Sequence, residues 1–419
     1  MSLQRPKERT VAQKYNGGNK MVLATCCEDC FDKYRDRSEG IMKLIHISDL
    51  HLGKRLNEYS LLEDQEYILT KIINMIDDEK PEGVIIAGDV YDKSVPSAEA
   101  ITLFDEFLVR LSARNLKVFI ISGNHDSPER LSFANRLINQ SGVYISPVYN
   151  GEISPVTLSD EFGNLSIFML PFIKPANVKR FYPDEELGSY KDAVKVIVKS
   201  MVLDPENRNI LITHQFVTGA TRCDSEDIAV GGSDNIDADV FEHFDYVALG
   251  HIHGPQSVTR KTIRYCGTPL KYSFSEVSHE KSVTVIELRE KGNIEIRTLP
   301  LKSKRDMREI KGKYNDLMLK ENYEDTNVDD YIHITLTDED DIPYAINKLG
   351  VVYHNIMKLD YDNKRTRSNA VIAGAEDVKQ RSPMDLFEEF FEKQNNQKMN
   401  DKQRTFTSEL IEKIWEGAK

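Results

Sequence analysis

Short apolar segments that end in polar clusters recur along this sequence and constrain its fold more than any other feature. Five of them lie at residues 43–47, 84–87, 117–122, 209–213 and 246–249. Two further strands are expected at 166–172 and 282–288. Amphipathic helices are expected at 61–78, 97–114 and 190–201. Short apolar strands that alternate with helices are typical of βαβ units and a largely buried sheet. We therefore predict a layered α/β domain, with sheets flanked by helices, over residues 42–300.

The polar clusters follow the ends of five expected strands. They contain aspartate, asparagine and histidine, and three of them begin with a glycine that allows a tight turn. In an open α/β sheet the carboxyl ends of the strands border the ligand crevice, so side chains from these five positions can converge. Seven candidate ligands result: Asp49, His51, Asp89, Asn124, His214, His251 and His253.

The types and spacing of these residues indicate a metal site. Asp49 and His51 are two residues apart, as are His251 and His253, so each pair projects to one side of an extended segment. Carboxylate, amide and imidazole ligands without a thiolate suit Mn²⁺, Fe²⁺ or Zn²⁺, and Mn²⁺ more than a soft-ligand metal. A single such pair is more often structural, whereas five clusters in order favour two ions that share a bridging carboxylate. We assign the other histidines to packing or to the surface: His46, His243, His279, His333 and His354.

Outside this domain the sequence divides into shorter regions. Residues 1–41 show no periodicity and are expected to be a poorly ordered extension. Their Cys26, Cys27 and Cys30 include a CxxC pair without the second pair that a zinc site needs, so we assign them no function. Residues 301–368 are expected to form a small second α/β domain, with a helical connector at 302–320, strands at 331–337 and 356–361, and a helix at 343–349.

A linker is expected at residues 369–381 and helices at 382–419. Each of these helices carries a narrow apolar stripe, made by Leu386, Phe387, Phe390 and Phe391 in one and by Phe406, Leu410, Ile411, Ile414 and Trp415 in the other. Such stripes either pack on their own domain or dock on a partner as a helix in a groove. The adjoining linker favours docking.

Composition limits the classes of function. The net charge of the 419-residue chain is −13, which argues against a free-standing binder of polyanions. No run approaches 18 consecutive apolar residues and no secretory signal is found, so no membrane association is expected. The five cysteines are sparse and odd in number, which favours a reducing cytoplasm over a disulfide framework.

The order of the motifs, DxH, GDxxD, GNHD, a single histidine and GHxH, resembles the calcineurin-like metallophosphoesterase family. Residues 170–182 (LPFIKPANVKRFY), 230–256 (VGGSDNIDADVFEHFDYVALGHIHGPQ) and 267–270 (GTPL) look more specifically like the bacterial SbcD nucleases within it. The resemblance is close from residue 42 to about 300. It continues more loosely over 330–338 and 355–361, where the family has a small capping domain. Residues 1–41 depart from the family pattern.

The resemblance implies a role for each motif residue. It implies one ion held by Asp49, His51 and His253 and a second held by Asn124, His214 and His251, with Asp89 bridging both. His125 matches a non-ligand histidine that faces the phosphate, and Asp126 would orient it. Two divalent ions, of which Mn²⁺ is preferred, would offset the phosphate charge and activate a water molecule. His125 would stabilise the developing charge or protonate the leaving oxygen, which is worth about 10²–10⁴-fold in rate.

The resemblance further implies a DNA exonuclease and endonuclease subunit that hydrolyses phosphodiester bonds at DNA ends and hairpins in repair and recombination. Its implied partners are a second copy of the chain and SbcC, an ABC-type ATPase with a long coiled coil, in a heterotetramer. Two alternatives stay open at this point. One is a small-molecule phosphodiesterase with the same metals, which would need neither the capping domain nor the apolar stripes. The other is a catalytically silent architectural subunit, which the complete set of motif residues disfavours.

Overall fold

The computed structural model of the chain describes residues 40–226, 235–364, 366, 383–395 and 397–416. The expected linker at 369–381 and the three cysteines of the expected extension lie outside these residues. The chain divides into two compact units. The first contains Gln65–Pro269, Glu280–Leu301 and the described residues up to Gly53. The second contains Lys54–Asp64, Leu270–His279 and the described residues from Lys302 onward.

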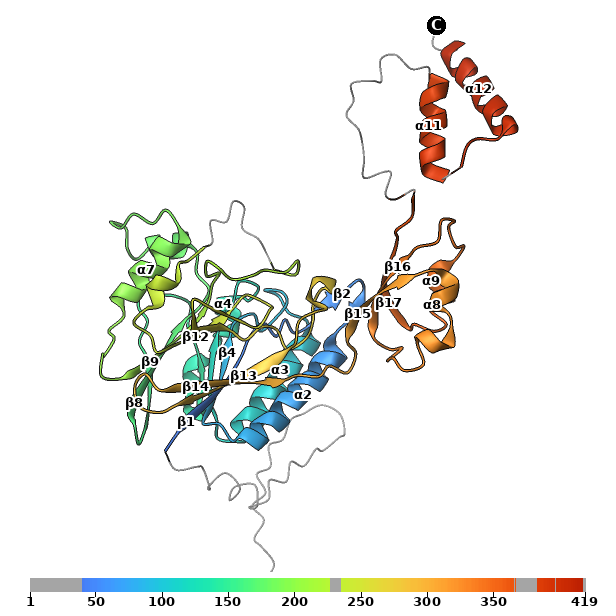
Figure 1. The fold of residues 1–419 in the computed structure, drawn as a ribbon. Coiled ribbons are helices and arrows are strands. Elements are labelled where there is room, and N and C mark those ends of the chain that lie inside the picture. The colour runs from blue at the N-terminus through green and yellow to red at the C-terminus, as the bar shows by residue number, and fades with distance from the viewer. Residues whose placement is uncertain (1–39, 227–234, 365, 367–382, 396, 417–419) are drawn as a thin grey trace, which may run out of the picture. The chain divides into compact units, whose positions relative to one another are not determined.

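Two six-stranded sheets form the framework of the first unit (Figure 1). In one, β1 (Met42–Ile47), β4 (Gly83–Ala87), β5 (Lys117–Ile121) and β6 (Val143–Ile145) are parallel neighbours, and β13 (Ser282–Leu288) pairs antiparallel with β1 and with β14 (Ile294–Pro300). In the other, β8 (Gly163–Leu170), β9 (Arg208–His214), β10 (Tyr246–Gly250) and β12 (Arg260–Tyr265) are parallel, with β7 (Val156–Asp160) and β11 (Gln256–Val258) antiparallel at the edges. The seven expected strands and the layered α/β class are confirmed.

The two sheets pack face to face through one apolar cluster. Successive side chains of a strand point to opposite faces, so alternate apolar residues of each strand reach this layer. Leu44 and Phe119 contribute from the first sheet, and Ile167, Ile212 and Ala248 contribute from the second; all five are completely buried. The packing therefore fixes the register of the parallel strands that carry the candidate ligands.

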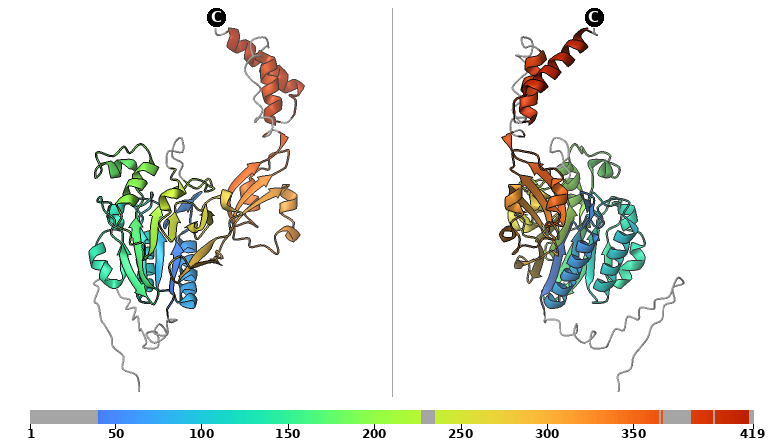
Figure 2. Two further views of the ribbon diagram at one scale, coloured as in Figure 1. Left: turned by 60° about the vertical axis from the view of Figure 1, so that its left-hand side comes forward. Right: turned by 90° about the vertical axis from the view of Figure 1, so that its right-hand side faces the viewer.

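Helices cover the outer faces of both sheets. In α7 (Tyr190–Ser200), Val194 and Ile197 pack against Leu211 and Val247 of the second sheet. Two longer helices, α2 (Leu62–Glu79) and α3 (Ala98–Ser112), lie along the first sheet (Figure 2). With their faces covered, the sheets leave the loops at the strand ends as the place where polar side chains can gather.

A parallel three-stranded sheet forms the centre of the second unit. It consists of β15 (Met307–Gly312), β16 (Tyr331–Leu336) and β17 (Asn355–Tyr361) in that order. The helices α8 (Tyr314–Leu317) and α9 (Ala345–Leu349) pack with it around a small apolar core that contains Leu317, Ile332 and Leu349. The expected strands at 331–337 and 356–361 and the helix at 343–349 are confirmed.

The expected helical connector at 302–320 is wrong, because residues Met307–Gly312 form the strand β15. The charges that suggested a solvated helix instead make ion pairs along the sheet. Arg308 Nε lies 2.7 Å from Asp330 Oδ2, and Lys311 Nζ lies 2.5 Å from Asp362 Oδ2. These partners are distant in sequence, so the local pattern of charges did not reveal them.

Two helices end the described chain, α11 (Pro383–Asn395) and α12 (Asp401–Glu416). They contact each other, and Arg404 Nε lies 2.5 Å from Glu388 Oε1. Both expected helices are thus confirmed within the described residues. Among those residues, no helix is both long enough and apolar enough to cross a membrane.

Candidate metal centre

The five loops that carry the candidate ligands meet at one end of the first unit. In the first sheet, β1 and β5 flank β4 as parallel neighbours, and β9 and β10 are parallel neighbours in the second. The loops after β1 and β4 are joined by backbone hydrogen bonds: Asp49 N donates to Gly88 O at 3.0 Å and His51 N donates to Asp89 O at 3.0 Å. The convergence expected from the strand ends is therefore present in the structure.

One group of candidate ligands contains Asp49, His51 and His253. One potential ligand atom from each lies within 4.8 Å of the others, and all three residues are buried. The Nε2 atoms of His51 and His253 are 3.2 Å apart. This is the same set that the resemblance assigns to the first ion.

A second group surrounds the amide oxygen of Asn124. This Oδ1 lies 3.0 Å from His214 Nε2 and 3.0 Å from His251 Nδ1. Asp89 lies between the groups, because its Oδ2 is 3.3 Å from His214 Nε2 and 3.7 Å from His51 Nε2. The structure thus brings all seven candidate ligands together, with the expected bridging carboxylate in the middle.

The donor atoms of the second group fit a bound cation. His214 Nδ1 donates to Ala87 O at 2.9 Å, so in the neutral ring Nε2 carries a lone pair. That lone pair faces the oxygens of Asp89 and Asn124, which are themselves acceptors. A hydrogen bond from the second ring nitrogen to a backbone carbonyl is also the common way in which proteins orient a histidine that binds a metal.

The electrostatic field at the centre favours positive charge. Burial would lower the pKa of His214, but Asp89 and Asp49 outweigh it and raise that pKa to about 9. Burial would likewise raise the pKa of Asp89, but His214, His51 and His125 hold it well below its usual range. A proton on His214 therefore supplies the charge that a divalent cation would supply. The residues present fit a divalent metal ion.

Four of the seven candidate ligands have a left-handed backbone conformation. The φ angles are 53° for Asp49, 43° for His51, 49° for Asp89 and 100° for His251. For a residue with a side chain this conformation costs roughly 1–2 kcal/mol. Such strain persists where the surrounding structure enforces it, and it concentrates at functional sites. Its concentration here is evidence for a site that does not depend on the sequence motifs.

Glycine is required beside the ligands because the loops approach each other closely. A Cβ atom at Gly250 would lie 1.9 Å from Ala87 O, and one at Gly123 would lie 2.1 Å from Asp89 Oδ1. At both positions the reason is this close approach, since neither residue has a positive φ. The expected tight turn with positive φ is present at Gly88, where φ is 88°.

His125 lies at the edge of the cluster. Its Nδ1 is 2.9 Å from Asp92 O, which leaves Nε2 directed toward Asp89 Oδ2 at 4.0 Å. Its side chain is 22% exposed, whereas those of His51 and Asp89 are 1% and 2% exposed. His125 can therefore reach both the cluster and a molecule bound from solvent.

Asp126 has partners other than the expected one. Its carboxylate accepts hydrogen bonds from three backbone amides, Val90 N at 3.1 Å, Tyr91 N at 2.9 Å and Gly123 N at 2.9 Å. The His125 ring is oriented by Asp92 O. Asp126 thus joins the loop after β4 to the loop after β5 through these backbone amides. Its expected role in orienting His125 stays a prediction.

The sequence analysis missed the residues whose side chains form hydrogen bonds with the backbone of the candidate ligands. Glu226 Oε1 accepts from His253 N at 2.6 Å, and Lys281 Nζ donates to His253 O at 2.9 Å. The side chain of Gln65 donates to His51 O at 2.7 Å. All three residues are at least 94% buried. None of them belongs to a strand-end motif, so no local signal in the sequence could have identified them.

Comparison with known proteins agrees with this geometry. Residues 42–255 match the calcineurin-like phosphoesterase family. Residues 303–395 match the SbcD_C family, described as type 5 capsule protein repressor C-terminal domain. A relative from Staphylococcus epidermidis, named as the SbcD component of the nuclease SbcCD, is 33% identical over 377 residues, which cover 88% of this chain and 98% of the relative.

Solved structures align with the chain less closely. A dimetal phosphatase from Danio rerio is 14% identical, with a TM-score of 0.38, and covers 63% of this chain and all of its own. A phosphoesterase from E. coli is 14% identical, with a TM-score of 0.26, and covers 62% of this chain and all of its own. At these scores the structural alignments add nothing to the assignment, which depends on the sequence matches. The chain belongs to the calcineurin-like phosphoesterases and, within them, to the metal-dependent nucleases of the SbcD family.

Proposed function

We propose that this chain is the nuclease subunit of an SbcCD-type complex and hydrolyses phosphodiester bonds at DNA ends and hairpins in repair and recombination. The observation that carries the proposal is the convergence of seven metal-binding side chains from five loops around the carboxylate of Asp89. The nearly full-length match to a relative of that name supports it. The sparse cysteines favour a cytoplasmic location.

The proposed centre binds two divalent ions. Asp49, His51 and His253 hold one ion, Asn124, His214 and His251 hold the other, and Asp89 contributes to both. Oxygen and imidazole ligands without a thiolate favour Mn²⁺ among the first-row metals. When bound, the two ions neutralise phosphate charge and supply a nucleophile from water at neutral pH.

The protein itself contributes the proton chemistry at the leaving group. His125 Nδ1–H is held by Asp92 O, so Nε2 is the ring atom that faces the cluster. Its partial exposure lets it approach a phosphate that enters from solvent. Because Nδ1–H is bonded to Asp92 O, a donor at Nε2 requires the imidazolium form of the ring. In the proposed reaction this form stabilises the developing charge or passes its Nε2 proton to the leaving oxygen, which leaves the neutral ring with its proton on Nδ1.

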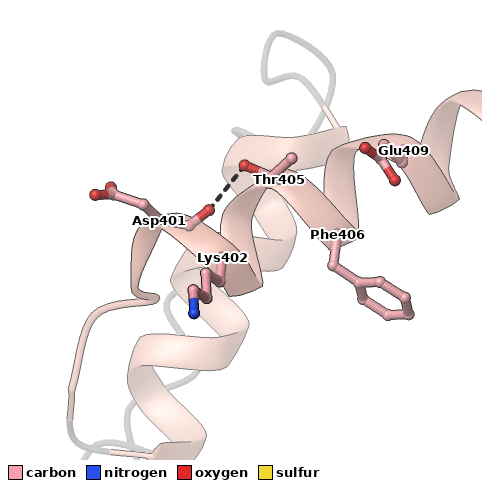
Figure 3. Close-up of a pocket in the computed structure, with 5 residues that line it drawn as sticks. All are labelled: Asp401, Lys402, Thr405, Phe406 and Glu409. Carbon is pink, nitrogen blue, oxygen red and sulfur yellow. Dashed lines mark hydrogen bonds between the residues drawn. The ribbon is translucent and has the colours of Figure 1, made fainter.

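The apolar stripes of α11 and α12 are proposed to dock on an SbcC-type ATPase. Phe390 and Phe406 are 58% and 67% exposed, and Phe387 and Leu410 are also exposed. Figure 3 shows the Phe406 ring projecting from α12, where Phe406 lines a pocket together with Asp401, Lys402, Thr405 and Glu409. Exposed aromatic side chains on an amphipathic helix are the anchors of helix-in-groove recognition.

A homodimer completes the proposed assembly. Phe133 and Leu137 follow the GNHD loop and are 80% and 74% exposed, and exposed apolar side chains that lie together are a common feature of protein–protein contacts. We propose that a second copy covers them and that two copies of the ATPase complete a heterotetramer. A chain of net charge −13 should bind DNA weakly alone, so we propose that the ATPase contributes to DNA binding.

The experiment compares four substrates with and without the partner ATPase. Purified chain and Mn²⁺ are incubated with end-labelled linear and hairpin DNA, with a cyclic nucleotide and with an aryl phosphodiester. We expect metal-dependent cleavage of both DNA substrates that increases when the ATPase is added. The variant Asp89→Ala is expected to lose this cleavage, whereas Asp184→Ala, which changes an exposed aspartate, is expected to keep it. Hydrolysis of the small esters with no cleavage of DNA in either setting would overturn the proposal.

A further inference from the structure

An arginine lies beside the metal centre on the segment that follows β9. Phe216 is two residues after the candidate ligand His214, and the guanidinium carbon of Arg222 lies 3.5 Å from the centre of the Phe216 ring. Both side chains are partly exposed. This stacking holds the arginine at the border between the buried cluster and solvent.

Hydrogen bonds connect the residues on either side of Arg222 to the segment 251–256, which carries His251 and His253. Thr221 N donates to Gln256 Oε1 at 2.8 Å, and Gln256 Nε2 donates back to Thr221 O at 2.8 Å. On the other side, Cys223 N donates to Glu226 Oε2 at 2.8 Å, and Glu226 Oε1 accepts from His253 N at 2.6 Å. The position of Arg222 is therefore coupled to that of the metal ligands.

Arg222 places a permanent positive charge against the ring of Phe216, two residues after the candidate ligand His214. The seven ligands bring two carboxylates and no permanent cation to the site. Arg222 is thus a fixed positive charge close to where an anionic substrate would bind.

We propose that Arg222 binds a phosphate of the DNA strand next to the phosphate that is cleaved. This inference rests on the proposed nuclease function and adds a substrate-binding residue to it. Stacking on Phe216 uses the flat face of the guanidinium, whereas its N–H donors lie in the plane and match the oxygens of a phosphate. A polynucleotide offers such a neighbouring phosphate and a small aryl phosphodiester does not. Arg222 therefore selects the polymer over the small ester.

The test measures DNA cleavage and aryl phosphodiester hydrolysis by the complex with the ATPase, for the wild type and for Arg222→Gln, over a range of KCl concentrations. For DNA we expect KM to rise about tenfold, as for one lost charged hydrogen-bonding contact, with little change in kcat. The slope of log KM against log salt should decrease by about 0.7–0.9, the value for one phosphate contact. The kinetics of the aryl ester should stay unchanged.

Two further variants separate this role from simpler ones. Arg222→Lys keeps the charge and should keep the salt slope, with a smaller rise in KM. Lys199→Gln removes one exposed charge from α7 and should change neither quantity. The inference would be overturned, while the nuclease function stands, by either of two results for Arg222→Gln. One is an unchanged KM and salt slope for DNA, and the other is an equal loss of kcat/KM for DNA and for the aryl ester. If the wild type hydrolyses the aryl ester and never cleaves DNA, the proposed function itself fails.

Discussion

Replacing Asp126 with alanine should remove the hydrogen bonds that join the loop after β4 to the loop after β5. The carboxylate is 6% exposed and accepts from the backbone amides of Val90, Tyr91 and Gly123. A hydrogen bond to a charged group contributes about 1.5–3 kcal/mol. Because neighbouring contributions are not additive, we expect the three together to lower the free energy of unfolding by about 3–5 kcal/mol. For a domain of this size that corresponds to a decrease in Tm of roughly 10 °C.

The loss should extend to metal binding, because Val90 follows Asp89 and Gly123 precedes Asn124. Thermal unfolding followed by near-UV circular dichroism with EDTA measures the stability, and elemental analysis after incubation with Mn²⁺ measures the metal content. Asp184→Ala is the matched control at an exposed aspartate and should behave as the wild type does. If Asp126→Ala keeps the wild-type Tm and metal content and loses only turnover, the carboxylate acts through His125 and our reasoning is refuted.

Three other substitutions test separate parts of the molecule. His125→Asn should keep the metal content but lose turnover by about 10²–10⁴-fold, measured with the aryl phosphodiester; wild-type turnover would exclude its role. Burial and then Arg264 lower the pKa of His46 to about 3, so the unfolded chain binds the extra proton as the pH falls from about 6.5 and the folded state loses stability. In His46→Gln the decline in the free energy of unfolding between pH 6.5 and 4, measured by urea titration, should be shallower by up to about 1.4 kcal/mol per pH unit, and an unchanged slope would contradict this. Phe406→Ala should weaken binding of the ATPase in a pull-down without changing metal uptake, and unchanged binding would argue against the docking surface.

Most of the first unit could be predicted from local patterns in the chain. Short apolar segments followed by glycine, aspartate and histidine are local signals, and each predicted strand is present. The seven candidate ligands were named from the same pattern because strand ends in such sheets share one edge. The assignment of Asp89 to the position between the two groups came from the family resemblance, and the distances to His51 and His214 agree with it.

Other features depend on contacts between residues far apart in the chain. The six-residue segment at β15 became a strand because it pairs with β16, although its charges suggested a helix. Asp126 received three backbone partners, two of which are more than 30 residues away. Glu226 and Lys281 are 27 and 28 residues from the histidine that they hold. The packing of the sheets determines these partners, and the local sequence does not predict them.

The strained backbone at four ligands shows the same division. The sequence supplied the side chains that can bind a cation, and their order along the chain. The left-handed φ angles that aim Asp49, His51 and Asp89 into the centre exist because two packed sheets and their joined loops enforce them. The intrinsic backbone preference of Asp and His disfavours positive φ angles. These angles are therefore adopted only when the sheets have packed.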